Sequence, residues 1–290
     1  MFALSARLNL RRPGARSIAL AFLLLLAPGQ AVSDEVLPYA EGETPRFDWY
    51  YAAAFGTGRY SAGERTVTAL RVPLAWELNR EEEARARVRL LAPVTLGAVD
   101  FGLEGVIDDP LDSVSMLMFT PGVELQWPVG DQWRVRSFAY LGGGVEFEGD
   151  DRAWIYAAGV SARRDLPCQR IQCRLGLALT WAGFNSSQRS RDDMSNVSAG
   201  LDVILPGATE GFHRLLHPGF FLIYRNYFSG VEFIFDPRGV GQLGDEWEVG
   251  MSMNANRPFS VFGLRFDRLG VSYRRSGELR GVHLTGQFPF

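Results

Sequence analysis

The amino-acid sequence is short of several features, and each shortage argues against a class of protein. Its 290 residues carry 30 basic and 33 acidic side chains, a formal net charge of −3, which indicates neither a nucleic-acid-binding surface nor an acidic disordered tail. Histidine occurs three times and cysteine twice, and no histidine stands near the cysteines, which argues against a zinc site there. Beyond residue 31 no run approaches the roughly 18 uninterrupted apolar residues of a membrane helix.

The N-terminus has the three parts of a secretory signal peptide. An arginine-rich opening is followed by an apolar stretch over residues 18–27 and by a small-x-small sequence that ends at Ala31. The apolar stretch is too short to span a bilayer as a helix, which takes about 20 residues. We therefore predict a signal peptide over 1–31, a short periplasmic segment over 32–45 and the main domain over 46–290. The exported chain is then either soluble or a closed barrel, because lipid tolerates no other non-helical backbone.

An alternation of apolar with polar or small residues dominates the main domain. In TVTALRVPLAWEL, for example, Leu70, Val72, Leu74 and Trp76 alternate with residues such as Arg71. This period of two is typical of a sheet with one apolar and one mixed face. Twelve such segments lie between turn signals, at residues 46–60, 64–78, 84–99, 114–128, 133–146, 152–163, 172–183, 194–204, 218–228, 245–254, 267–275 and 279–290. Twelve is an even number, as in single-chain outer-membrane barrels.

The sequence thus predicts an all-β fold, an antiparallel transmembrane β-barrel of about 12 strands. A soluble barrel with its polar face outward would show the same alternation, so a secreted soluble β protein stays open at this point. With both termini in the periplasm, PGATEGFHRLLHP and NRPFSVFGLRFD would be periplasmic connections between strands. These two are longer than the short periplasmic turns of such barrels.

The tryptophans support the membrane alternative. None of the seven is expected at the centre of a strand, whereas a soluble sandwich would bury several of them there. Membrane barrels instead gather aromatic side chains in two girdles at the interfaces. The predicted girdle residues are Trp49, Trp76, Trp127, Trp133, Trp154, Trp181 and Trp247.

Two cysteines, Cys168 and Cys173, lie close together in LPCQRIQC. In an exported protein such a pair favours a disulfide across a turn, with two free thiols as the alternative.

Charged side chains gather on the face opposite the apolar one, which would line the inside of the barrel. The predicted lumen charges are Arg71, Arg85, Arg87, Arg89, Glu124, Arg134, Arg136, Arg174, Asp202, Arg225, Glu246, Glu248 and Arg274. Two interpretations compete: oppositely charged pairs that fill and rigidify a small barrel, or a cationic pore lining that favours anionic solutes. We favour pairing.

The last strand resembles the C-terminal signal of outer-membrane β-barrel proteins. In VHLTGQFPF, apolar Val282, Leu284, Phe288 and the terminal Phe290 stand at alternate positions. The resemblance implies that the barrel assembly machinery reads this segment and that the last strand pairs with the first. These four side chains would face lipid, while His283 and its polar neighbours face the lumen. Outer-membrane lipids and lipopolysaccharide would then be the surroundings of the barrel.

A larger part of the chain is similar to solitary autotransporter-type β-barrels. The similarity rests on RVPLAW, MFTPGVELQWPVGDQW, YAAGVSARRDLP, DEWEVGMSM and RLGVSYRR. It implies a translocator-type barrel without a passenger domain, located in the bacterial outer membrane.

The sequence indicates no catalytic residue, metal site or cofactor. Serine hydrolysis needs a base within reach of the nucleophile, and none of His213, His217 and His283 begins the His-x-Ser-Asn motif of outer-membrane lipid hydrolases. The acidic pairs at 108–109, 150–151 and 192–193 are interpreted as solvated loop charge rather than calcium sites. We expect a structural barrel or a narrow pore for small solutes, and keep a lipid hydrolase and a surface adhesin or receptor as alternatives.

Overall fold

A computed structural model describes most of the main domain. The described residues are 50, 52–62, 65–78, 86–99, 114–147, 151–187, 191–211, 214–229, 232–236, 239–242, 244–261, 264–277 and 279–290. The chain divides into two compact units, Met1–Val36 and Leu37–Phe290, and all described residues belong to the second. The predicted signal peptide and the 32–45 segment therefore lie outside the described residues.

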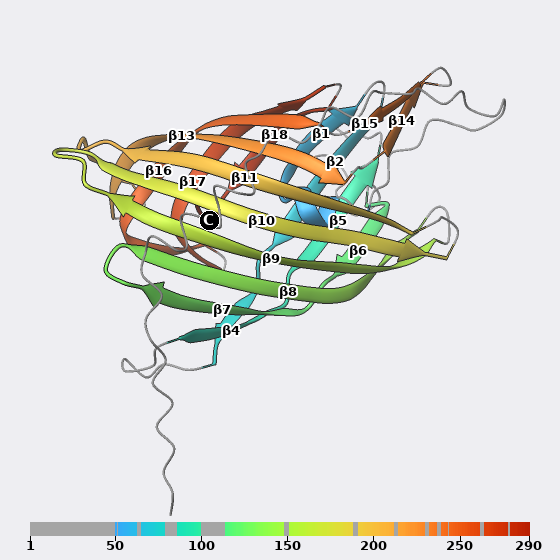
Figure 1. Ribbon diagram of the computed structural model, residues 1–290, viewed down its shortest axis with the longest axis horizontal. Coiled ribbons are helices and arrows are strands. Elements are labelled where there is room, and N and C mark those ends of the chain that lie inside the picture. The colour runs from blue at the N-terminus through green and yellow to red at the C-terminus, as the bar shows by residue number, and fades with distance from the viewer. Residues whose placement is uncertain are drawn as a thin grey trace, which may run out of the picture. The chain divides into compact units, whose positions relative to one another are not determined.

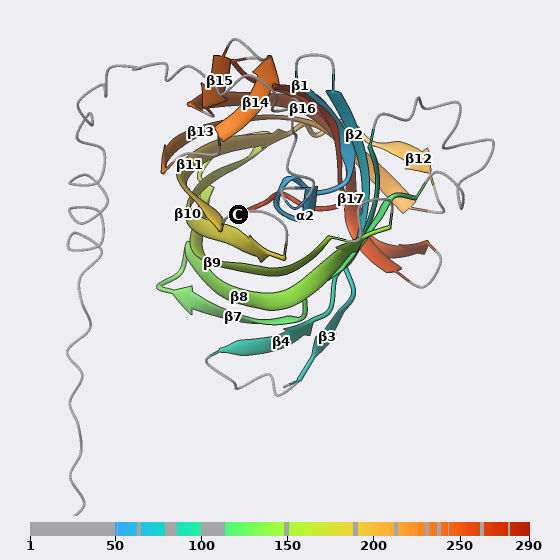
Figure 2. The ribbon, with the colours of Figure 1, turned by 90° about the vertical axis from the view of Figure 1, so that its right-hand side faces the viewer.

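The domain is a closed antiparallel β-barrel of twelve strands (Figures 1 and 2), which confirms the predicted fold class. Nine strands are continuous: β1 (Gly58–Ala62), β8 (Trp133–Glu146), β9 (Arg152–Leu166), β10 (Gln172–Ser186), β11 (Asp192–Ile204), β13 (Arg214–Ser229), β16 (Asp245–Val261), β17 (Leu264–Ser276) and β18 (Leu279–Thr285). The barrel closes where β1 pairs with β18, Gly58 opposite His283.

The other three strands are each interrupted. They are β2 (Arg65–Val72) with β3 (Ala75–Glu77), β4 (Arg87–Leu91) with β5 (Val94–Val99), and β6 (Met116–Phe119) with β7 (Gly122–Val129). Each break contains a proline, namely Pro73, Pro93 and Pro121. The pairing register is the same on both sides of each break. Because proline has no N–H, each break marks a lost ladder donor in an otherwise continuous strand.

Two short elements extend the barrel beyond its wall. β12 (Thr209–Gly211) pairs with the start of β13, and β14 (Glu232–Asp236) pairs with β15 (Gly239–Gln242) as a separate hairpin. The two long connections predicted from PGATEGFHRLLHP and NRPFSVFGLRFD are wrong, because much of both segments is strand. Their polar and proline residues are typical of loops, but residues 209–211, 214–218, 256–261 and 264–267 lie in strands.

The two faces of the wall are inverted relative to a soluble protein. Outward-facing Leu222 and Met251 are 42% and 58% exposed, whereas inward-facing Glu248 and Arg274 are 1% and 5% exposed. A continuous apolar outer surface of this kind is stable only when something apolar covers it. No helix among the described residues is long and apolar enough to cross a membrane.

Both ends of the domain depart from the predicted strands. The first predicted strand, 46–60, is wrong over much of its length, because Ala52–Phe55 forms the short helix α2 and β1 begins only at Gly58. The last predicted strand, 279–290, stops at Thr285. Figure 2 shows that α2 and the C-terminus lie inside the ring of strands.

The outer surface makes a prediction about lipid exposure. Met251 lies four residues beyond Trp247 on the outer face of β16. Met251→Arg should lower the free energy of unfolding of the refolded protein in lipid vesicles by about 2–4 kcal/mol, the usual cost of arginine on a lipid-facing barrel position. Denaturant titration measures this. Gln169→Arg, in the exposed turn before β10, is the control and should change little; equal stability of both variants would contradict a lipid-facing wall.

Candidate functional site in the barrel interior

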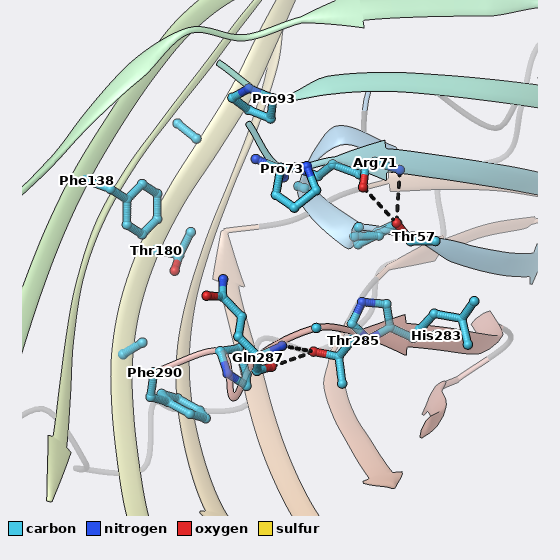
Figure 3. Close-up of a pocket in the computed structure, with 18 of the residues that line it drawn as sticks. Thr57, Arg71, Pro73, Pro93, Phe138, Thr180, His283, Thr285, Gln287 and Phe290 are labelled. Carbon is cyan, nitrogen blue, oxygen red and sulfur yellow. Dashed lines mark hydrogen bonds between the residues drawn. The ribbon is translucent and has the colours of Figure 1, made fainter. Parts of the chain in front are cut away.

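The interior holds a cavity of about 1100 Å³. Figure 3 shows Pro73 and Pro93 on one side of it and Gln287 and Phe290 on another. Side chains from most strands of the wall line it, together with α2 and the C-terminal residues. The cavity is therefore what remains of the lumen after both ends of the domain have folded into it.

The N-terminal helix α2 is held inside the barrel at its C-terminal end. Gly56, with φ of 88°, allows the chain to turn from α2 into β1. The Phe55 carbonyl accepts hydrogen bonds from the Tyr60 hydroxyl at 2.8 Å and from Nη1 of Arg274 at 3.1 Å. A cation at this end of a helix also meets the exposed carbonyls favourably. Wall residues thus fix the position of α2.

A second set of contacts holds Tyr50, two residues before α2. The Tyr50 ring stacks on Phe184 with the ring centroids 4.2 Å apart. The Tyr50 hydroxyl donates to the carboxylate of Asp151, which also accepts from Ser186 and Ser187. Asp151 belongs to a sequence pair interpreted as solvated loop charge, and that interpretation is wrong for it, because it is 1% exposed. Loop position in the sequence could not reveal that Tyr50 would reach it from 101 residues away.

The C-terminal residues turn into the lumen, and the prediction that Phe288 and Phe290 face lipid is wrong. The two rings are 5% and 7% exposed and contact one another with centroids 5.0 Å apart. Phe290 sits over Gly176 and Gly200, where a Cβ on either glycine would overlap its ring. Val282 and Leu284 do face outward, being 49% and 56% exposed.

Polar contacts hold the same tail. Arg136 donates a hydrogen bond to the Pro289 carbonyl. The Arg268 guanidinium lies 4.7 Å from the Phe221 ring centroid and 5.7 Å from that of Phe288. Such cation–π contacts are worth about 0.5–2 kcal/mol, more when desolvated. The tail is therefore packed as part of the core and not loosely enclosed.

The largest group of lumen charges forms one network on β13, β16 and β17. Nη2 of Arg274 lies 2.7 Å from Oε1 of Glu246, and Nη2 of Arg225 lies 2.7 Å from Oε2 of Glu248. Arg225 also contacts Glu246. Ser272 donates to Glu248 at 2.6 Å, and Nδ1 of His283 lies 3.3 Å from the same carboxylate. Two buried carboxylates thus meet two arginines, which compensates their burial.

Two smaller groups complete the pattern. Arg89 and Arg136 share Glu124, at 2.8 and 3.7 Å. Asp202 meets Arg174 at 3.6 Å and Arg268 at 2.9 Å. Arg268 was not among the predicted lumen charges, although its parity with Arg274 along the strand would have placed it on the same face.

The remaining predicted lumen charges have other positions. Arg71 lies with its guanidinium 5.5 Å from the Tyr140 ring centroid and lines the cavity. Arg87 and Arg134 are exposed near strand ends, and Arg85 lies outside the described residues. Arg89, Glu124, Arg136 and Tyr140 line the cavity together with Arg71.

Four of the predicted girdle tryptophans are exposed on the outer face, and the two cysteines form a disulfide. Trp76, Trp154, Trp181 and Trp247 are 41–65% exposed on the outer face, Trp127 and Trp133 are half-buried, and Trp49 lies outside the described residues. Cys168 and Cys173 are joined by a disulfide across the turn between β9 and β10. Of the histidines, His213 lies outside the described residues, and His217 lies in β13.

A solved structure of the β-domain of the Bordetella autotransporter BrkA is similar to this chain, with a TM-score of 0.51, 12% identity, and coverage of 79% of this chain and 94% of that one. This chain has the fold of an autotransporter β-domain. A structure from work on in-meso crystallization of membrane proteins has a TM-score of 0.35 with 14% identity, over 80% of this chain and 83% of that one. No family model and no curated protein matches the chain.

The autotransporter-like barrel makes a prediction about its charge network. Glu246→Gln leaves Arg225 and Arg274 without one of their two carboxylates, and breaking a buried pair in this way costs about 3–5 kcal/mol. The loss is measured by denaturant unfolding of the refolded protein in micelles. Asp165→Asn, which alters a half-exposed pair with Arg174 at 3.6 Å, is the control and should cost less than about 1 kcal/mol. An unchanged midpoint for Glu246→Gln would show that the network contributes nothing to stability.

Proposed function

We propose that the protein is an outer-membrane β-barrel that is closed from the inside by its own terminal segments, with a structural role rather than that of an open channel. The observation that carries the proposal is the packing of Phe290 on Gly176 and Gly200 within the lumen. On the other side of the cavity, α2 is held by Arg274 and Tyr60. Both segments narrow the lumen.

The membrane location is supported by the wall itself. Its outer face exposes leucine, valine, methionine and aromatic side chains, and its inner face buries charged and hydroxyl groups. That arrangement is the one that a barrel in lipid requires. The similarity to the β-domain of an autotransporter points the same way. Outer-membrane lipids would cover the outer face, and the barrel assembly machinery would act on the last strand through outward-facing Val282 and Leu284.

The paired charges favour the structural alternative over an anion-selective pore. Arg225, Arg274 and Arg268 each contact a buried carboxylate, so their charge is compensated within the wall. Passage of small anions is the second candidate function, because the guanidinium groups of Arg71, Arg89 and Arg136 line the cavity of about 1100 Å³. The size of the steps in a conductance recording separates the two.

A lipid hydrolase is not favoured by the described residues. Ser272 and His283 both contact Glu248, so the histidine is bound to the carboxylate that also holds the serine. A nucleophilic serine instead needs the imidazole as its own hydrogen-bond partner. We propose a non-enzymatic barrel.

Displacing the tail should open the barrel. Gly176→Val places a side chain where the Phe290 ring lies, and should raise single-channel conductance in planar bilayers several-fold over the nearly silent wild-type protein. Deletion of residues 287–290 should act in the same direction. Gly207→Val, at an exposed turn with no atom near its Cβ position, is the matched control.

The wild-type protein and each variant must first be shown to fold, by the shift in gel mobility between heated and unheated samples. Large and stable conductance steps from the wild-type barrel would contradict the proposal. So would equal conductance of the wild type and a folded Gly176→Val variant, because the tail would then not close the lumen.

A further inference from the structure

The pairing between β17 and β18 stops before β17 has reached its first residue. The last pair is Gly270 with Thr285, whereas β17 begins at Leu264. Among the described residues the start of β17 pairs only with β16, so its other edge has no strand beside it. Continued in the same register, residues 286–290, here called the tail, would stand opposite 269–265. The free edge of β17 therefore fits the tail in length and in register.

The side chains of the tail also fit a position in the wall. Leu284 faces outward, and every second residue after it would do the same in an extended strand. Phe288 would then join the outer face opposite Asp267, which is exposed near the start of β17. In the structure, however, Phe288 and Phe290 are buried in the lumen. The tail therefore has two positions to which its sequence is matched, one in the lumen and one in the wall.

In the lumen, other groups take the place of the ladder for the backbone of the tail. Backbone groups point alternately to the two neighbours of a strand, and Leu284 bonds the segment before β1, so those of Gln287 and Pro289 would point to β17. The Thr285 hydroxyl instead bonds both the N–H and the carbonyl of Gln287 (Figure 3). Arg136 donates to the Pro289 carbonyl, and proline has no N–H. These two residues therefore have partners without the wall.

The lumen position also has a cost. The Cζ atom of Arg268 lies 5.7 Å from the ring centroid of Phe288 and 2.9 Å separates Arg268 from Asp202, and both charged residues are buried. Among the described residues, none of the guanidinium nitrogens and neither carboxylate oxygen makes an aligned hydrogen bond. Buried polar groups of this kind are stabilised when water reaches them. Departure of the tail would admit water, which brings its two positions closer in free energy.

We propose that the tail is a gate with two positions. In the closed position its two phenylalanines pack in the lumen, with Phe290 over Gly176 and Gly200. In the open position residues 286–290 extend β18 along the free edge of β17, and the space that they filled in the lumen becomes continuous with the cavity. The inference rests on the proposed closure of the barrel by its terminal segments and adds that the closure by the tail is reversible.

A disulfide tests whether the tail reaches the wall. Opposite residues of a ladder are close enough for a disulfide, and residue 288 would stand opposite residue 267. In Phe288→Cys/Asp267→Cys, oxidation of the folded protein in lipid vesicles should join the two new cysteines, and mass spectrometry of peptides measures the yield over time. Cys168 and Cys173 are already joined and do not compete.

The matched control for the cross-link is Phe288→Cys/Leu269→Cys. Leu269 lies on the same outer face of β17, two residues out of register with position 288, so this pair should join several-fold more slowly. The closed position cannot form either bond, because Phe288 is buried inside the wall while Asp267 and Leu269 are exposed outside it. Equal rates for the two pairs, or no bond in the first, would overturn the gate.

Single-channel recording tests what the two positions do. Pro289→Val supplies an N–H that a wall strand would donate to β17, and should raise the fraction of time spent open about twofold to tenfold, as expected for one hydrogen bond. Thr285→Val removes the hydroxyl that bonds Gln287 in the lumen and should act in the same direction. Thr209→Val, at an exposed position of β12, is the matched control and should change nothing.

The recordings also separate this inference from the proposed function. The oxidised Phe288→Cys/Asp267→Cys barrel should stay open and should close again on reduction. If Gly176→Val opens the barrel but the oxidised pair conducts no more than the reduced one, the tail is a fixed plug and the gate is overturned. If Gly176→Val also changes nothing, the proposed function fails with it. Unchanged open fractions in both Pro289→Val and Thr285→Val would likewise overturn the gate.

Discussion

The closed ladder of backbone hydrogen bonds is the constraint on which the rest of this structure depends. In lipid a backbone N–H or C=O without a partner costs several kcal/mol, so each strand must have a neighbour on both sides. Closure through the pairing of β1 with β18 meets this demand for most of the wall. The ladder is interrupted at Pro73, Pro93 and Pro121, where proline has no N–H that could be left unpaired.

Closure also decides what the interior must contain. A wall that is apolar outside has its polar face inside, so charged side chains on neighbouring strands lie next to one another on that face. Glu246 and Glu248 are buried side by side on β16, and Arg225 of β13 and Arg274 of β17 compensate them from the strands on either side. The same network holds α2 through the Phe55 carbonyl. Arg274 thus both pairs with Glu246 and holds α2. Because the charges are paired with one another, α2 can be stable among them.

At both ends of the domain, strand pairing in the wall competes with burial of aromatic side chains in the lumen. Residues 52–55 form α2 and the pairing of β18 ends at Thr285, and Tyr50, Phe55, Phe288 and Phe290 are buried. Phe290 finds a matched surface over Gly176 and Gly200, and Tyr50 finds one against Phe184. Burial of these rings on the inside offsets the strand pairing that is given up at the wall.

The sequence by itself determined the fold class, the number of strands and the side of the wall on which most side chains lie, because a period of two is a local property of each strand. β8 begins and ends at the predicted residues 133 and 146. Only the tertiary structure decided that α2 and the C-terminal residues lie inside the barrel. Phe288 and Phe290 continue the alternation of Val282 and Leu284, so the pattern placed them in lipid. Their inward turn depends on two glycines in distant strands, Gly176 and Gly200, and no local pattern records that contact.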